Sequence, residues 1–175
     1  SRNNFTDGLT LIERFLEARD DSQMLVLKSY FMTMTGDLAG AQALIDSFND
    51  EIKSVPFVRG VIARIKLRQG NANGAVEDAK IAYEGNPSTK SMLVLATAYD
   101  LSGQSEKSFS LLSTHLDNNP KDLRAMMLLA EKKIAANKDD AISLYQDALK
   151  LDENNSVVLN NLAYLLTEEG QLDEA

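Results

Sequence analysis

The chain has 175 residues, 44% of them hydrophobic, and its 18 lysines and arginines against 26 aspartates and glutamates give a net charge of -8. This acid excess argues against nucleic acid as a partner, because phosphate binding needs a clustered positive surface. It fits either a binding protein for a basic ligand or a surface that is simply kept soluble. The absence of cysteine excludes disulfides and thiolate metal sites. No apolar run reaches the roughly 18 residues of a membrane span.

Apolar residues at helical spacing, separated by turn-forming residues, predict helices throughout the chain. The first covers residues 6–18, with Leu9, Ile12 and Phe15 on one face. Asp37 is expected to cap a helix that runs from about residue 38 through Phe48, and the stretch 53–56 is expected to be a break. The other predicted helices cover 23–35, 57–69, 72–84, 89–102, 105–116 (with Ser105 as its cap), 122–136, 139–150 and 156–169.

Three columns of residues recur along these helices every 33 or 34 positions. The helix-stopping column is Gly36, Gly70, Gly103, Asn137 and Gly170, and we assign Gly8, 28 residues before Gly36, as its earlier member. Small residues stand seven positions before each stop, at Ser29, Ala63, Ala96, Ala130 and Ala163. A second column of small residues stands four or five positions after each stop, at Ala41, Ala75, Ser108, Ala141 and Ala175. Glycine and asparagine tolerate the left-handed conformation that ends a helix, and small side chains let helix backbones approach closely.

This pattern, with Pro87 and Pro120 between helices, resembles the tetratricopeptide repeat. The resemblance implies an all-α fold, a right-handed superhelical solenoid of antiparallel helix pairs with about 34 residues per repeat. We expect one solenoid over 1–175, cut from a longer array. Its units are a partial repeat 1–21, repeats 22–55, 56–88, 89–122 and 123–155, and a partial repeat 156–175. Uncovered ends, with Phe15 and Leu16 at one and Leu159, Leu162 and Leu166 at the other, predict self-association.

Some residues depart from the family pattern. Lys28, Lys66, Lys133 and Arg59 occupy places that the family usually gives to apolar residues. Their long stems can lie along apolar surface with the charge in water, which predicts looser packing in the second repeat.

The first helix of each pair lines the concave face of such a solenoid, where a protein or peptide segment is expected to bind. Counting back six, ten and thirteen residues from each stop selects the inward-facing positions. The predicted partner-binding residues are Tyr30, Phe57, Arg64, Lys90, Thr97, Arg124, Glu131, Asn160 and Tyr164. Leu93, Met127 and Val157 fall in the same columns, where packing between neighbouring first helices is the alternative.

Residues suited to catalysis or cofactor binding are sparse, so we expect no enzyme, no cofactor and no metal site. The single histidine, His115, has the register of a helix-packing residue, and no glycine-rich phosphate loop occurs. The acidic pairs, such as Asp139-Asp140, fall at predicted helix starts, where they complement the helix dipole.

Two settings for a scaffold remain open. Residues 157–166, Val-Val-Leu-Asn-Asn-Leu-Ala-Tyr-Leu-Leu, are similar to a stretch of the long bacterial repeat lipoproteins of the PEP-CTERM exopolysaccharide and protein-sorting system. That resemblance implies a periplasmic protein held to the membrane by a lipid outside this segment. The alternative is a cytoplasmic chaperone-type or regulatory adaptor. Some family members bind the terminal carboxylate of a chaperone with a cluster of lysine and asparagine side chains. At the equivalent places of this chain, only Lys90, Arg124 and Asn160 are of a suitable type.

Overall fold

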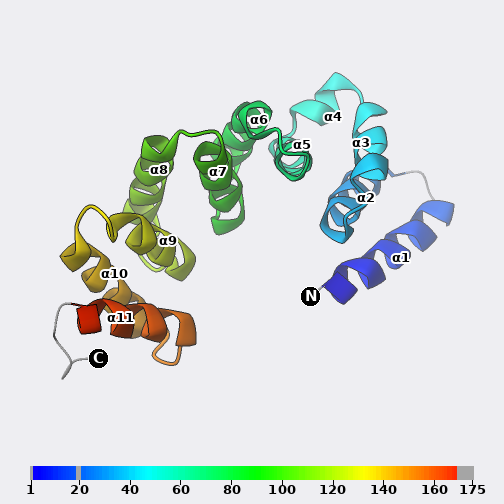
Figure 1. Cartoon of the computed structure of the whole chain (residues 1–175). Coiled ribbons are helices and arrows are strands. Elements are labelled where there is room, and N and C mark those ends of the chain that lie inside the picture. The colour runs from blue at the N-terminus through cyan, green and yellow to red at the C-terminus, as the bar shows by residue number, and fades with distance from the viewer. Residues whose placement is uncertain (1, 19–20, 169–175) are drawn as a thin grey trace. The chain divides into compact units, whose positions relative to one another are not determined.

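The computed structural model describes residues 2–18 and 21–168, and all the regular structure in these ranges is α-helical (Figure 1). The helices are α1 (Arg2–Ala18), α2 (Ser22–Thr35), α3 (Leu38–Asp46), α4 (Asp50–Ser54), α5 (Pro56–Arg68), α6 (Ala72–Gly85), α7 (Thr89–Leu101), α8 (Ser105–Asn118), α9 (Leu123–Lys133), α10 (Lys138–Leu151) and α11 (Ser156–Glu168). The predicted all-α fold class is therefore confirmed. Within these ranges, no helix combines the length and the apolar character that crossing a bilayer requires.

The chain forms two compact units, residues 1–104 and residues 105–175. In the first unit α1 packs on α2, α2 on α3, α5 on α6 and α6 on α7. The first helices of successive repeats also touch, since α5 contacts both α2 and α7. In the second unit α8 packs on α9, α9 on α10 and α10 on α11. Packing between near neighbours in sequence is the pattern of a repeat array, in which each hairpin covers the next.

Glycine ends the helices where the repeat pattern predicted it, at Gly36, Gly70 and Gly103, with φ of 100°, 78° and 75°. A Cβ on Gly70 or Gly103 would meet no atom within 4 Å, so the left-handed backbone alone requires glycine there. The prediction for Asn137 is wrong. Its φ is -155°, and its side chain caps α10 by accepting from the Asp140 amide.

Gly8, assigned to the helix-stop column although it falls within the predicted helix 6–18, lies inside α1. It has no side chain because the Phe31 ring of α2 occupies the space that a Cβ would need. Gly170 falls outside the described residues. Ser105, predicted to cap its helix, is already the first residue of α8.

A short helix occupies part of the predicted break before the second repeat. Helix α3 ends at Asp46, so the buried Phe48 lies beyond it, and α4 follows. The Asn49 side chain accepts a hydrogen bond from the Ile52 amide at 2.9 Å, and Asp50 and Glu51 stand in the first turn of α4. Acidic residues and an asparagine cap stabilise a helix start, a signal that the sequence prediction overlooked.

The small residues of the repeat columns are buried at the helix contacts, as predicted. In the column before the stops, Ser29, Ala63, Ala96 and Ala130 are buried and Ala163 is half-buried. In the column after the stops, Ala41, Ala75, Ser108 and Ala141 have no exposed surface, and Ala175 lies outside the described residues. The helices therefore approach each other through side chains of one or two heavy atoms.

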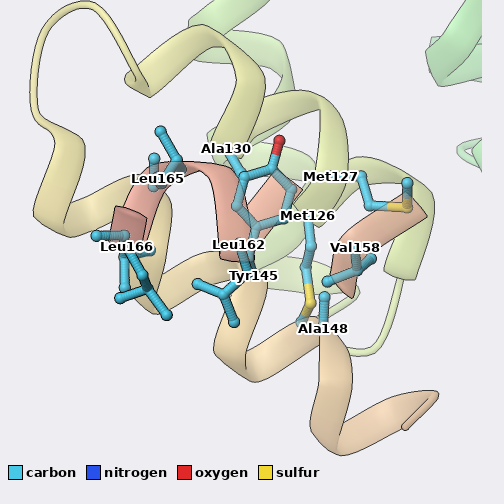
Figure 2. Close-up of a cluster of buried hydrophobic side chains, with 11 residues drawn as sticks. Met126, Met127, Ala130, Tyr145, Ala148, Val158, Leu162, Leu165 and Leu166 are labelled. Atoms are coloured by element: carbon cyan, nitrogen blue, oxygen red, sulfur yellow. The ribbon is translucent and has the colours of Figure 1, made fainter. Parts of the chain in front are cut away.

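Figure 2 shows the core of the 105–175 unit, to which three successive helices contribute Met126, Met127, Ala130, Tyr145, Ala148, Val158, Leu162, Leu165 and Leu166. Tyr145 is fully buried, and its hydroxyl accepts a hydrogen bond from Asn161 at 3.1 Å. Leu162 and Leu166 were expected to lie uncovered at the end of the chain, but both are buried in this cluster. Leu159, in contrast, is 43% exposed and Phe15 of α1 is 39% exposed, as expected.

The basic residues at apolar positions form ion pairs, where we expected their charges to lie in water. Lys66 and Arg59 on α5 both bind Asp78 on α6, at 2.5 and 2.8 Å. Asp78 is buried, so two cations neutralise a carboxylate inside the α5–α6 hairpin. Lys133 likewise pairs with Asp140 at 2.5 Å, and Lys28 with Glu13 at 3.1 Å.

His115 has the packing role that its register predicted. It is 1% exposed, and its Nε2 lies 2.9 Å from an oxygen of Asp122, which precedes α9. The other oxygen of Asp122 accepts from the amides of Arg124 and Ala125, each at 3.1 Å. One carboxylate thus caps α9 and ties it to α8.

We expect Ala63→Leu to lower the free energy of unfolding by about 1–3 kcal/mol, because a larger side chain overpacks a contact with no free volume. Urea denaturation followed by circular dichroism measures this. Ala43→Leu on the exposed face of α3 is the matched control, with an expected change within about 0.5 kcal/mol. Equal effects at the two sites would contradict the close helix contact.

We expect Asp78→Ala to lower the free energy of unfolding by about 1–3 kcal/mol, since it leaves the cations of Arg59 and Lys66 without their counter-charge. Asp140→Ala removes the pair to Lys133, where the carboxylate is 48% exposed, and should cost about 1 kcal/mol or less. The same denaturation experiment compares the two. A smaller loss for Asp78→Ala than for Asp140→Ala would show that the buried carboxylate is not the stronger link.

Candidate binding groove

Two adjoining hollows lie on the first helices of the 1–104 unit. The larger, of about 670 Å³, is lined from α2, α5 and α7 together with Phe5 of α1. The second, of about 520 Å³, extends along the starts of α5 and α7 and the end of α6. Both are lined by Tyr30, Arg64, Lys90 and Val94. We call the two hollows together the groove.

Aromatic rings form one wall of the groove. The Tyr30 ring centroid lies 5.8 Å from that of Phe31, 6.1 Å from that of Phe5 and 5.6 Å from that of Phe57. The first two pairs meet edge to face, a favourable geometry for aromatic rings. Phe57 is nevertheless 49% exposed, so the wall presents apolar surface to solvent. A half-covered aromatic cluster beside a hollow is typical of a binding surface.

Positively charged side chains are the second feature of the groove. Arg64 and Arg68 stand one turn apart on α5, and Lys90 is near the start of α7. Arg64 Nη2 donates to the Lys90 carbonyl at 3.4 Å, a long hydrogen bond. Burial is the main cause that lowers the pKa of Arg64, Tyr30 partly offsets it, and the charge of Arg68 adds to the lowering. The guanidinium is thus partly stripped of water while its only hydrogen bond within the described chain is to a neutral carbonyl.

The structure brings together the five predicted partner-binding residues of the first unit. Tyr30, Arg64, Lys90 and Thr97 line the larger hollow or both, and Phe57 lines the second. The four in the second unit, Arg124, Glu131, Asn160 and Tyr164, are exposed on α9 and α11. Of the three residues with a packing alternative, Met127 is buried in the core of its unit, Leu93 lines the larger hollow, and Val157 is 51% exposed.

The sequence prediction missed several lining residues, among them Phe5, Phe31 and Arg68. Arg68 could have been found, because it follows Arg64 by four residues and so shares its helix face. Phe31 could not, because it stands five residues before Gly36, outside the three inward-facing columns, and only the fold shows that it lines the larger hollow.

Within the described residues, no group of three or more histidine, aspartate or glutamate side chains could hold a metal ion. The groove is likewise without a histidine or carboxylate among its described lining residues. What this arrangement offers a ligand is apolar surface, hydrogen-bond donors and positive charge.

Comparisons with known proteins agree with this fold. The family model described as tetratricopeptide repeat matches residues 144–175. TTC0263, a tetratricopeptide-repeat protein of Thermus thermophilus, has a similar structure with a TM-score of 0.73 and 20% identity, over 94% of this chain and 92% of that one. The structure of MamA gives a TM-score of 0.68 and 14% identity, over 88% of this chain and 92% of that one.

YrrB, described as a tetratricopeptide-repeat protein with an unusual peptide-binding site, gives a TM-score of 0.65 and 13% identity, over 91% of this chain and 84% of that one. The search of curated proteins finds no match to this chain. The chain therefore has the fold of solved tetratricopeptide-repeat proteins, and its residues 144–175 match the tetratricopeptide-repeat family model.

Proposed function

We propose that this chain is a non-enzymatic interaction scaffold that binds a segment of another protein in the groove of its 1–104 unit. The observation that carries the proposal is the convergence of Tyr30, Arg64 and Lys90, from three successive first helices, on two connected hollows. The tetratricopeptide-repeat fold supports it, since stacked helix pairs form extended concave surfaces suited to such segments.

The dimensions and composition of the groove favour a peptide over a compact small molecule. Two hollows of about 670 and 520 Å³ in succession offer more length than a single enclosed cavity. Apolar pockets with a few polar anchors are the features by which extended or helical peptides are recognised. The neighbour YrrB, whose description mentions a peptide-binding site, supports the same class of ligand.

The most buried ionisable side chains of the described chain already have structural partners, which supports a non-enzymatic role. Asp78 holds Arg59 and Lys66, and His115 holds Asp122. A general acid or base must instead reach a substrate from an open cleft.

The setting of this scaffold is a further part of the proposal. The likeness of residues 157–166 to bacterial repeat lipoproteins favours an envelope scaffold, with a cytoplasmic adaptor as the alternative. In the structure Val158, Leu162, Leu165 and Leu166 of this stretch are buried, so helix packing alone demands much of its apolar pattern. The full gene separates the two settings, since a signal sequence with a lipidated cysteine supports the first and a start without one supports the second.

Self-association through exposed ends stays a prediction. Phe15 on α1 and Leu159 on α11 are 39% and 43% exposed, and we expect sedimentation to show oligomers as the protein concentration rises. Phe15→Ser with Leu159→Ser should restore the monomer. A strict monomer of the unmodified chain at high concentration would contradict the prediction.

We expect Phe57→Ala to weaken groove binding at least about tenfold, because an aromatic ring that lines a binding hollow is a typical hot spot. Peptides selected from a random phage library on the immobilised protein serve as probes, and fluorescence polarisation measures their dissociation constants.

Leu101→Ala is the matched control, since Leu101 is 66% exposed on α7 and lines neither hollow. Its binding should equal that of the unmodified chain, and circular dichroism should show all variants folded. Unchanged affinity for Phe57→Ala, or an equal loss for Leu101→Ala, would place the binding surface elsewhere.

A further inference from the structure

The charge of the groove is opposite to that of the whole molecule. The chain carries a net charge of -8, yet Arg64, Arg68 and Lys90 line the larger hollow, and no described lining residue of either hollow is acidic. Because potentials in a cleft are set by the charges that line it, the groove is locally positive. Net charge left open a basic ligand or a surface that is simply kept soluble, and the lining residues point to neither.

These three cations differ from the four basic residues that occupy apolar positions of the repeat. Lys66, Arg59, Lys28 and Lys133 each pair with a carboxylate within 3.1 Å. Among the described residues, Arg64, Arg68 and Lys90 form no ion pair. The two arginines repel each other, since each carries the same charge one helical turn apart. Holding them together without a counter-charge destabilises the free chain. Binding sites commonly keep such destabilising arrangements because the ligand needs them.

We infer that the groove accepts an acidic protein segment, whose carboxylates pair with Arg64, Arg68 and Lys90 while an apolar side chain packs on the Tyr30–Phe31–Phe5 wall. This inference rests on the proposed function and specifies the partner's chemistry. Arginine suits a carboxylate because its planar donors bind both oxygens. The aromatic wall adds an apolar anchor that charge alone does not provide, so the segment combines aspartate or glutamate with an aromatic or large aliphatic residue.

Phosphate groups could also pair with these cations, but the acid excess of the rest of the chain opposes a polyanion. Nucleic acid needs a positive surface that follows many phosphates, and its affinity grows with the number neutralised. Three cations beside apolar rings suit a short acidic segment better.

The test uses the whole chain and three labelled peptides of equal length. The first contains four glutamates and two phenylalanines, the second replaces the glutamates by lysines, and the third replaces the phenylalanines by serines. We expect fluorescence polarisation to show the first peptide binding at least about tenfold more tightly than either of the others, with affinity falling as salt rises. Tighter binding of the lysine peptide, of a phosphorylated peptide or of single-stranded RNA would overturn the inference.

Charge-removal variants locate the binding. Arg64→Met, Arg68→Gln and Lys90→Gln together should weaken the acidic peptide about 10–100-fold and flatten its salt dependence. The control is Arg14→Gln, Lys121→Gln and Lys150→Gln, which changes the net charge equally, from -8 by three to -11, at exposed positions outside the groove. Equal losses in the two triple variants would overturn the inference.

The outcome for the proposed function stays separate. The library peptides distinguish the two. If they are neutral or basic, bind Phe57→Ala more weakly and bind the Arg64–Arg68–Lys90 variant unchanged, then the groove is the binding surface but its partner is not acidic. Arg64→Met alone adds a stability readout. We expect its melting temperature to equal or exceed that of the unmodified chain, because it removes an unpaired, partly buried charge. A clear fall in melting temperature would show that Arg64 serves the fold rather than a ligand.

Discussion

Close contact between helices through side chains of one or two heavy atoms is the constraint on which the rest of this structure depends. Ala63 and Ala75 are fully buried in the α5–α6 hairpin, and a Cβ on Gly60 of α5 would lie 3.4 Å from that of Ala82 on α6. Because the arms of the hairpin lie so close, α5 also reaches the first helices before and after it, α2 and α7. That alignment places Tyr30, Arg64 and Thr97, each six residues before a helix stop, along one groove.

The distribution of charge follows from the same geometry. Where a basic residue falls against the second helix of its own hairpin, as Lys66 does, an acid such as Asp78 meets it. Where a basic residue falls on the open face of a first helix, as Arg64 does, the acids of the second helix are out of its reach. The chain is thus acidic overall and basic in its groove, and a local surface rather than net charge decides which ligand fits.

Much of the fold could be predicted because the repeat columns state a physical requirement at each position. Gly36, Gly70 and Gly103 satisfy a left-handed turn that few residues adopt, so the sequence carries that information directly. Gly8 misled the prediction because glycine has a second use, here the close approach of Phe31. The groove was predicted only in part, with Tyr30 and Arg64 following from register. The pairing of Lys66 with Asp78, and the lack of an acidic partner for Arg64 among the described residues, depend on distances across helices that periodicity does not encode.

A disulfide between α5 and α6 tests the close helix contact most directly, because the natural chain has no cysteine to interfere. A Cβ placed on the Gly60 backbone lies 3.4 Å from the Ala82 Cβ, which is near the roughly 3.5–4.5 Å of disulfides and suits the pair Gly60→Cys with Ala82→Cys. Mild oxidation of the folded variant should remove both thiols within one chain, as mass spectrometry and thiol titration would show. Gly60→Cys with Glu84→Cys, two residues further along α6 and on another face, should keep both thiols free. Two reactive thiols in the oxidised Gly60→Cys, Ala82→Cys variant would contradict the hairpin packing from which the groove arises.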